Sequence, residues 1–405
     1  MRLSARAQRI EPFYVMEMAK TATALAGEAE GAGRPMLYLN MGEPDFTAPP
    51  LVREAAGRAI RDGRTQYTQA TGLPELRERI SGWYRARFGL DVPARRIVVT
   101  AGASAALHLA CLALLDAGDE VLMPDPCYAC NRQFISVAEG RAALIPTTAA
   151  ERFQLSAAKV QDAWGPRTRG VLLASPSNPT GTSIHPDELR RILAVVAKRG
   201  GIGLIDEIYL GLSFEAAYSQ SALALSDQIV SINSFSKYFS MTGWRLGWMV
   251  VPEALAAPIE QLAQHLFICP STVAQYAALA CFEAESLAEY ERRRAEFKAR
   301  RDWFVPQLNA LGLTVPVMPD GAFYAWADCG AACQRLFAGR SEYNSELMAG
   351  SWEFALAAMR QARLTITPGR DFGHADTAHY VRFSTASSMT HLHTAVQRLR
   401  DWLQV

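Results

Sequence analysis

Short runs of apolar residues recur through the middle of the chain, and longer segments with helical spacing separate them. These runs occupy residues 96–100, 120–123, 170–174, 203–206, 229–233 and 246–251. Unbroken apolar strands are typical of a sheet that is buried on both faces, and intervening helices favour parallel pairing. The pattern therefore predicts an α/β fold, with a large domain whose mainly parallel sheet is sandwiched by helices.

The pattern changes after Pro270. Residues 271–311 have nearly continuous helical spacing, and the mixed charges at 289–301 are typical of a solvated helix face. Beyond about Val315, short strands and helices mix, which predicts a smaller α+β domain formed by the N- and C-terminal segments. The predicted boundaries are an N-terminal segment at 1–46 that packs with the small domain, a large domain at 47–285 and the small C-terminal domain at 286–405.

The balance of charge excludes several classes of partner. The 405 residues carry 41 Lys and Arg against 40 Asp and Glu, a formal net charge of +1. No large field is available to hold a nucleic acid or an anionic membrane. The longest uncharged apolar stretch, at 101–115, is shorter than the ~18 residues of a membrane span and reads as a buried helix. Charges also interrupt residues 1–25, so no signal peptide is expected and the expected location is the cytoplasm.

The cysteines predict neither a metal site nor a disulfide framework. There are seven, an odd count, which argues against such a framework in a chain without secretion signals. Cys127 and Cys130 have the spacing of a redox or zinc pair, but the other compact pair, Cys329 and Cys333, lies far along the chain. Incidental reduced thiols are therefore the preferred interpretation, and no metal is expected.

Lys237 stands in a turn that is rich in hydroxyl groups. It follows a predicted strand, with Ser234 and Ser236 just before it, in Ser-Phe-Ser-Lys, and Arg245 soon after it, in Gly-Trp-Arg-Leu-Gly. A lysine nucleophile must lose its proton and reach a carbonyl, and a phosphate needs hydroxyl and guanidinium donors. The first motif alone is weak, because most such lysines are surface charges. The two motifs together are more specific.

This segment resembles the cofactor-lysine signature of the class I/II aminotransferases, pyridoxal 5′-phosphate enzymes of fold type I related to aspartate aminotransferase. The resemblance implies that Lys237 carries pyridoxal phosphate as a Schiff base, and that Ser234, Ser236 and Arg245 bind this cofactor, with Ser234 and Arg245 on its phosphate. It implies an enzyme, a transaminase, that moves an amino group between an L-amino acid and a 2-oxo acid. The implied mechanism is ping-pong, through an aldimine and a ketimine.

Two polar segments at strand ends match the same family. Asp206 ends a buried strand, where ligands bind in such sheets, although a helix N-cap would also place an aspartate there. The resemblance implies that Asp206 pairs with the ring nitrogen and that Tyr209, three positions later, bonds the 3′-oxygen. Asn178 lies in Asn-Pro-Thr-Gly, which reads as an ordinary turn. In the family, this Asn amide lies beside the 3′-oxygen and the substrate carboxylate.

Four further cofactor contacts are implied by the resemblance. Ala103 and Ser104 begin a helix after a strand and would bind the phosphate, although many strand-to-helix turns look like this. Tyr128 would stack on the pyridine face. Tyr67 would reach the phosphate in the neighbouring subunit, which implies a homodimer with shared active sites. A half-exposed strand tyrosine is the simpler interpretation of Tyr67 alone.

Substrate binding depends on two more matches. Arg382 lies in a short alternating strand, and an arginine fork matches a carboxylate bidentately. Gly42, in Asn-Met-Gly-Glu-Pro-Asp, lets a backbone N–H approach that carboxylate. A surface arginine and a turn glycine are the alternatives. The resemblance runs from about residue 38 to 388, which is nearly the whole chain. It implies that the substrates are small molecules, an amino acid and a 2-oxo acid.

The preferred substrate stays open. Some prokaryotic aspartate aminotransferases place a lysine for the distal carboxylate where Ser104 stands here, which weakens a dicarboxylate preference. Phe13, Tyr14 and Phe267 are candidates for a pocket that suits neutral or aromatic side chains. C–S β-lyases and aminocyclopropanecarboxylate synthases resemble the same pattern and are the alternative function. A regulator built on this domain would add a basic helix-turn-helix domain, and a cofactor-free relative would lack cofactor contacts; neither is expected here.

Overall fold

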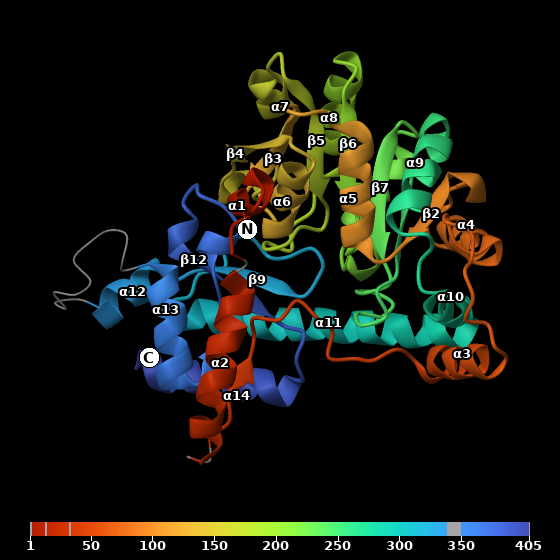
Figure 1. Cartoon of the computed structure of the whole chain (residues 1–405). Helices are drawn as coiled ribbons and strands as arrows, with labels where there is room; N and C mark the ends of the chain where they lie inside the picture. Colours follow the sequence, from red (N-terminus) through yellow and green to blue (C-terminus); the bar gives the residue numbers. More distant parts are fainter. Residues whose placement is uncertain (1, 13, 32–33, 338–349, 405) are drawn as a thin grey trace.

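The computed structural model describes residues 2–12, 14–31, 34–337 and 350–404. Its main feature is a seven-stranded sheet with the order β2-β8-β7-β6-β5-β3-β4 (Figure 1). β8 runs antiparallel to both neighbours, and the other paired strands are parallel. The predicted mainly parallel sheet is thereby confirmed. The strands are β2 (Ile97–Thr100), β3 (Glu120–Asp125), β4 (Arg141–Pro146), β5 (Thr168–Ala174), β6 (Ile202–Asp206), β7 (Ile229–Ser234) and β8 (Gly247–Val250).

Helices cover both faces of this sheet because successive strand residues point to opposite sides. Leu172 and Leu204 pack with α5 (Ala103–Leu114), α6 (Ala129–Val137) and α9 (Glu253–Leu266) on one face. The next residue of each strand, Leu173 and Ile205, packs with α7 (Ala157–Ala163) and α8 (Pro186–Lys198) on the other. The sandwich predicted from the unbroken apolar runs is confirmed.

The strand β4 was missed by the sequence analysis. Its residues are half-buried in the middle and exposed at both ends, and it lies at the edge of the sheet, where it pairs with β3 alone. An edge strand needs no unbroken apolar run because one of its sides faces solvent. The sequence Arg-Ala-Ala-Leu-Ile-Pro therefore carries little strand signal.

The N- and C-terminal segments together form a smaller α+β domain, as predicted. Its core joins Met18 and Leu39 from the start of the chain with Phe304, Phe383 and Leu399 from the end. Two small sheets support it, an antiparallel one in the order β11-β12-β9 and a parallel pair of β1 and β10. Its elements are α2 (Tyr14–Gly31), β1 (Leu37–Tyr38), β9 (Tyr324–Asp328), α12 (Gly330–Phe337), α13 (Ser351–Ala357), β10 (Leu364–Thr365), β11 (Thr367–Pro368), β12 (Tyr380–Ser384) and α14 (Met389–Leu403).

A long helix, α11 (Ala284–Ala310), runs below the large sheet and connects the two domains (Figure 1). Before it, α10 (Thr272–Leu279) ends in a tight turn at Ala280–Phe282, and Glu283 is extended. The helical prediction for 271–311 therefore holds except at 280–283. The predicted domain boundaries at 46/47 and 285/286 stay predictions. The remaining α-helices of the described chain are α1 (Ala5–Arg9), α3 (Pro50–Arg61) and α4 (Pro74–Phe88).

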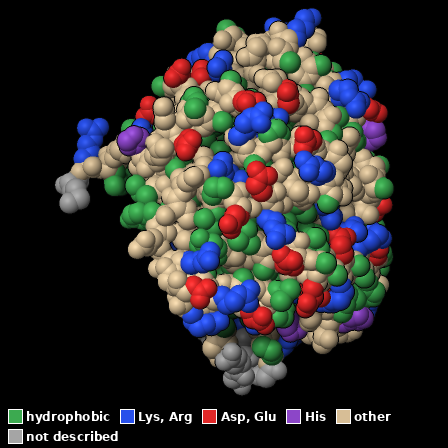
Figure 2. Space-filling model, turned by 90° about the vertical axis from the view of Figure 1, so that its right-hand side faces the viewer, with side chains coloured by type: hydrophobic (Ala, Val, Ile, Leu, Met, Phe, Trp, Pro, Cys, Tyr) green, Lys and Arg blue, Asp and Glu red, His purple; other side chains and the backbone are tan. Residues whose placement is uncertain are grey.

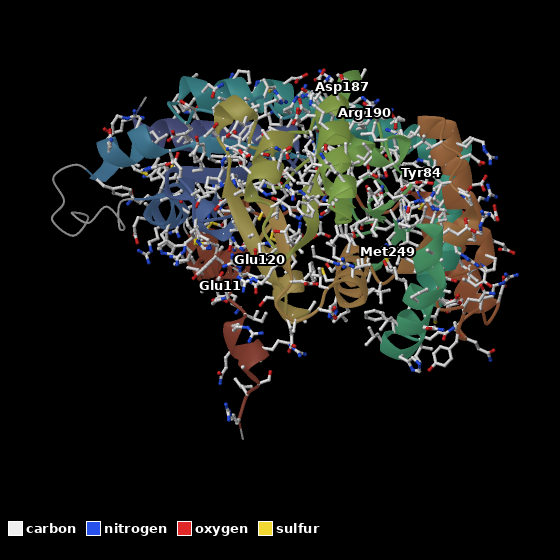
Figure 3. The ribbon with its side chains drawn as sticks, turned by 90° about the horizontal axis from the view of Figure 1, so that it is seen from above. Glu11, Tyr84, Glu120, Asp187, Arg190 and Met249 are labelled. Atoms are coloured by element: carbon white, nitrogen blue, oxygen red, sulfur yellow. The ribbon has the colours of Figure 1, made fainter. Side chains whose placement is uncertain are left out.

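The surface and the interior differ as a globular chain requires. Tyr84 of α4 and Met249 of β8 are fully buried in the large domain, whereas Asp187 and Arg190 of α8 pair at its surface (Figure 3). On the face shown in Figure 2, acidic and basic side chains are interspersed and do not gather by sign. No helix among the described residues is long and apolar enough to cross a membrane.

Candidate active site

A cavity of about 270 Å³ opens at the carboxyl ends of β5, β6 and β7, where the large sheet meets the small domain. Because these strands are parallel, the polar residues that end them meet at one edge. The cavity brings together every predicted site residue except Tyr67. These are Gly42, Ala103, Ser104, Tyr128, Asn178, Asp206, Tyr209, Ser234, Ser236, Lys237, Arg245 and Arg382.

Lys237 projects into this cavity from the turn after β7. Its Nζ donates a hydrogen bond of 2.6 Å to the carbonyl oxygen of Gly42. Burial lowers the pKa of Lys237 to about 8, and the positive charge of Arg382 acts in the same direction. The amine therefore loses its proton far more readily than that of an ordinary lysine. Such an amine is suited to attack a carbonyl or to accept a proton.

Asp206 is the last residue of β6 and is almost completely buried. Burial raises the pKa of its carboxyl to about 6, although the N–H of Ile208, the charge of Lys237 and the side chain of Asn131 lower it. Within the described chain Asp206 forms no ion pair, and no α-helix follows it directly, so the helix N-cap interpretation fails. A buried carboxylate that forms no ion pair is suited to a protonated ligand nitrogen.

Arg382 of β12 is also buried, with 2% of its surface exposed. Its guanidinium donates to Asn178 Oδ1 at 2.8 Å and to the carbonyl of Asn40 at 2.6 Å, and it lies 4.4 Å from the centre of the Tyr324 ring. Among the described residues no carboxylate pairs with it. The surface-arginine interpretation is therefore wrong, because an uncompensated buried guanidinium is suited to an incoming anion.

At one end of the cavity, the chain gathers groups that can donate hydrogen bonds to an anion. Gly102 has a φ of +86° directly before α5, and a Cβ atom there would lie 2.6 Å from a guanidinium nitrogen of Arg245. A Cβ on Gly247 would lie 2.8 Å from the backbone nitrogen of Ala103. The absence of these two side chains lets the start of α5 approach the Arg245 guanidinium closely. Hydroxyl groups of Ser104, Ser234 and Ser236 complete the donor set.

Phenol groups line the middle of the cavity. The hydroxyls of Tyr209 and Tyr324 lie 2.6 Å apart. Burial raises the pKa of Tyr128 and of Tyr209 well above its ordinary value, and it also raises the pKa of Tyr324. These phenols therefore stay neutral and act as hydrogen-bonding groups.

Tyr67 lies outside the cavity of its own chain. Its side chain is 84% exposed, and the residues around it belong to the turn between α3 and α4. The predicted role of Tyr67 in a neighbouring active site stays a prediction.

The comparison with known families decides the identity. The description "Aminotransferase class I and II" applies to the family model that matches residues 34–399. The chain belongs to the class I and II aminotransferases. It is therefore an enzyme, a transaminase, and the family resemblance seen in the sequence is confirmed.

Individual relatives of this aminotransferase are also named aminotransferases, but their names give different substrates. The chain is 36% identical to valine–pyruvate aminotransferase of Mycobacterium tuberculosis, over 97% of both chains. It is 33% identical to aspartate aminotransferase of Rhizobium meliloti, over 97% of this chain and 95% of the relative. The solved structure of aspartate aminotransferase from Thermus thermophilus with maleate aligns with a TM-score of 0.88 at 30% identity, over 99% of this chain and 100% of the other.

Several residues of the site carried no signal in the sequence of this aminotransferase. Val15 and Met16 at the start of α2 line the cavity, as do Glu43 and Tyr324. Asn131, which touches Asp206, could have been found only from the packing of α6. Tertiary contacts bring Val15, Met16 and Tyr324 to the cavity, whereas Glu43 directly follows Gly42 and Asn131 lies three residues after Tyr128.

Two of the substrate-pocket candidates named from the sequence, Tyr14 and Phe267, are not among the described residues that line the cavity. Tyr14 packs edge-on against Trp352 and receives a hydrogen bond from Arg370. Phe267 packs against the core beside α9, and Phe13 lies outside the described residues. At the start of α2, the neighbouring residues Val15 and Met16 line the cavity in place of Tyr14.

Proposed function

We propose that this aminotransferase uses pyridoxal 5′-phosphate bound to Lys237 and moves an amino group between an L-amino acid and a 2-oxo acid by a ping-pong reaction. One observation carries the proposal. A lysine whose pKa is lowered to about 8 and a buried carboxylate without an ion pair share one cavity with a set of phosphate-binding donors. The class I and II aminotransferases are, as a family, pyridoxal phosphate-dependent.

The residues present fit this cofactor from end to end. The phosphate would be held by the start of α5 and by the side chains of Ser234 and Arg245, where the missing Cβ atoms leave room for close approach. Asp206 would pair with the ring nitrogen. When bound, the cofactor supplies a protonated ring that accepts electrons from the α-carbon of the substrate. The remaining contacts are those of Ala103, Ser104, Ser236, Tyr128 on the ring face, and Asn178 and Tyr209 at the 3′-oxygen.

Lys237 moves the proton in this proposal. Once Nζ is no longer bound to the cofactor, it would take the proton from the α-carbon of the substrate. It would then return this proton to the bound substrate and cofactor from the same side. A base works best when its pKa lies near the operating pH, and a pKa of about 8 satisfies this condition better than an ordinary 10.4. The positive charge of Arg382 helps to keep the amine neutral.

Arg382 orients the substrate by its α-carboxylate. The guanidinium is held in place by Asn178 and Asn40, so its position is fixed before the substrate arrives. Gly42 would add its backbone N–H to the same carboxylate. A Cβ on Gly42 would lie 2.5 Å from the hydroxyl of Tyr324, so a side chain at this position cannot be accommodated.

The proposal includes a homodimer in which Tyr67 serves the partner's cavity. Tyr67→Phe should weaken cofactor binding even though the residue lies outside its own cavity. Mixed dimers of Lys237→Ala and Tyr67→Phe chains test this arrangement. If the sites are shared, one of the two sites of a mixed dimer is damaged twice and the other is intact. Activity that follows each chain independently would contradict it.

The test of the reaction uses the chain reconstituted with pyridoxal 5′-phosphate. We expect an absorbance band of the Lys237-bound cofactor, its loss on adding an amino acid alone, and its return on adding a 2-oxo acid. The relatives carry names for valine and for aspartate, so both donors are used. Release of ammonia and pyruvate from cystathionine, without need of a 2-oxo acid, would overturn the proposal in favour of a C–S lyase.

A further inference from the structure

The charges that line the cavity are unevenly distributed. Among the described residues, three cationic side chains line it, Lys237, Arg245 and Arg382. In the proposed function each of them already has a partner. Lys237 binds the cofactor aldehyde, Arg245 binds the phosphate, and Arg382 binds the α-carboxylate of the substrate. A second carboxylate on the substrate would therefore find no cation of this chain that is still available.

The cavity also holds a carboxylate that the proposed mechanism does not use. Glu43 lies directly after Gly42, accepts a hydrogen bond from the hydroxyl of Thr242, and forms no ion pair within the described chain. Its negative charge acts on Lys237, whose pKa it raises in opposition to burial. A dicarboxylic substrate would place a like charge near Glu43.

The rest of the lining is largely hydrocarbon. We call Val15 and Met16, in the first turn of α2, the apolar wall. Val15 is 6% exposed and Met16 48%, so Val15 is buried and Met16 is accessible to solvent. Met41, Leu107, Phe134 and Ile208 add further apolar surface to the same cavity.

The apolar wall is held in place by contacts from the far end of the chain. The Asp371 carboxylate accepts hydrogen bonds from the backbone N–H groups of Tyr14, at 2.9 Å, and Val15, at 2.6 Å. The guanidinium of Arg370 lies 4.2 Å from the centre of the Tyr14 ring and donates to its hydroxyl at 3.1 Å. Two consecutive residues of the small domain thus fix the start of α2 against the cavity.

We propose that the substrate side chain is neutral and apolar, an aliphatic chain of branched type, and that Val15 and Met16 determine this specificity. The inference rests on the function proposed above and goes beyond it by naming the substrate class. A hydrocarbon side chain gains by burial against the wall, and a carboxylate loses its hydration there without gaining a partner. The lining that this chain supplies therefore disfavours aspartate and glutamate as donors.

The first experiment measures binding, without turnover. Calorimetric titrations of the reconstituted enzyme compare the non-reacting monocarboxylate 4-methylpentanoate with the dicarboxylates succinate and maleate. We expect the monocarboxylate to bind about tenfold or more tightly, because each buried methylene contributes roughly a tenfold factor or more. Equal or tighter binding of the dicarboxylates would overturn the inference. A preference for 6-aminohexanoate over 4-methylpentanoate would overturn it too, because Glu43 would then select a cation.

The second experiment moves a charge onto the wall. Met16→Lys should improve the binding of succinate relative to 4-methylpentanoate by about twofold to fivefold, because it supplies a cation at a partly exposed position. Met318→Lys is the matched control, since Met318 is 45% exposed and does not line the cavity. The absorbance of the Lys237-bound cofactor checks that each variant is folded and loaded. If the two variants change the binding ratio equally, the specificity role of Met16 is refuted.

Failure of this inference and failure of the proposed function give different results. If no amino donor removes the absorbance band of the Lys237-bound cofactor, the proposed function itself fails, and the inference fails with it. If donors are consumed and aspartate reacts as efficiently as valine or leucine, only the substrate class is wrong. Half-reactions with alanine, valine, leucine and aspartate, each measured as kcat/KM, separate these outcomes. The expected order is leucine or valine, then alanine, then aspartate, with about tenfold between the first and second.

Discussion

Two buried aspartates hold opposite parts of the same active site. Asp206 belongs to the floor of the cavity, which we define by Asp206, Lys237 and Asn178 at the strand ends, and Asp371 supports the apolar wall of Val15 and Met16. Both are nearly inaccessible, and burial raises the pKa of each carboxyl to about 6. Their partners differ. Asp206 accepts the N–H of Ile208, two residues away, whereas Asp371 accepts those of Tyr14 and Val15 from the other end of the chain.

This difference shows that burial and pKa do not by themselves identify a catalytic group. Asp206 faces the cavity and carries a charge that a ligand nitrogen can use. Both carboxylate oxygens of Asp371 accept hydrogen bonds from the backbone of α2. Its role is therefore to position that helix. Variants on the floor should therefore change the chemistry, and variants at the wall should change the binding of the substrate.

The largest effect should follow removal of the central amine on the floor. Lys237→Ala should reduce turnover by about 10⁴-fold or more, since both the covalent attachment and the proton transfer are lost. The measurement is the half-reaction with an amino donor, together with the absorbance of the bound cofactor. Thermal unfolding of the variant shows whether the fold survives. Turnover near the wild-type level would refute the role of Lys237.

Loss of charge at the other floor position should be smaller. Asp206→Asn keeps the shape and removes the negative charge, and kcat should fall by about 10²–10³-fold, as when one electrostatic stabiliser is removed. Glu207→Gln is the matched control. Glu207 is a buried neighbour that accepts hydrogen bonds from Ser221, Ser231 and the N–H of Ala222, so its variant should lose stability and keep the cofactor spectrum. Equal losses of kcat in the two variants would mean that Asp206 has no role in the chemistry beyond the structural role of Glu207.

Arg382→Lys tests the carboxylate site between floor and wall. Lysine keeps the charge and lacks the planar fork that Asn178 and Asn40 hold in place. We expect the Kd of monocarboxylate inhibitors to rise by about 10–100-fold, in line with the loss of a bidentate charge-assisted pair. Titration calorimetry measures it. An unchanged Kd would mean that the α-carboxylate binds elsewhere.

Asp371→Asn should affect the wall and spare the floor. Asparagine cannot accept both backbone N–H groups with its two terminal atoms, so the start of α2 should loosen. We expect KM for branched donors to rise about threefold to tenfold, as expected for one lost charge-assisted hydrogen bond, with kcat within about twofold. Steady-state kinetics measures the split. A fall in kcat with unchanged KM would place Asp371 in the chemistry.

The smallest effect concerns pH and stability. Burial raises the pKa of Asp371 from about 3.9 to about 6, against the opposing charges of Arg382 and Arg132. A raised carboxyl pKa adds stability below the unfolded value, and this contribution is lost as the pH rises through 6. Denaturant unfolding at pH 4.5 and pH 7 should therefore show wild type losing stability relative to Asp371→Asn as the pH rises. A parallel response of both chains would contradict the linkage.

Much of the fold and of the floor could be predicted from the sequence because both depend on local patterns. Parallel strands bring their carboxyl ends to one edge, so Asn178, Asp206 and Lys237 meet once the strands are recognised. The strand β4 could not be predicted, because an edge strand needs only half of its residues buried. The break at 280–283 could not be predicted either, since its residues keep helical composition.

By itself, the amino-acid sequence determined the alternation of strands and helices, the lysine with its hydroxyl and guanidinium neighbours, and the strand-end carboxylate. Short-range spacing encodes these features, so they need no knowledge of distant contacts. Only the tertiary structure decided that Val15 and Met16 line the cavity, that Asp371 holds the start of α2 there, and that Arg382 is buried without a carboxylate partner among the described residues. These outcomes depend on how the two ends of the chain pack together, and the side chains on either side of those contacts are separated by hundreds of residues.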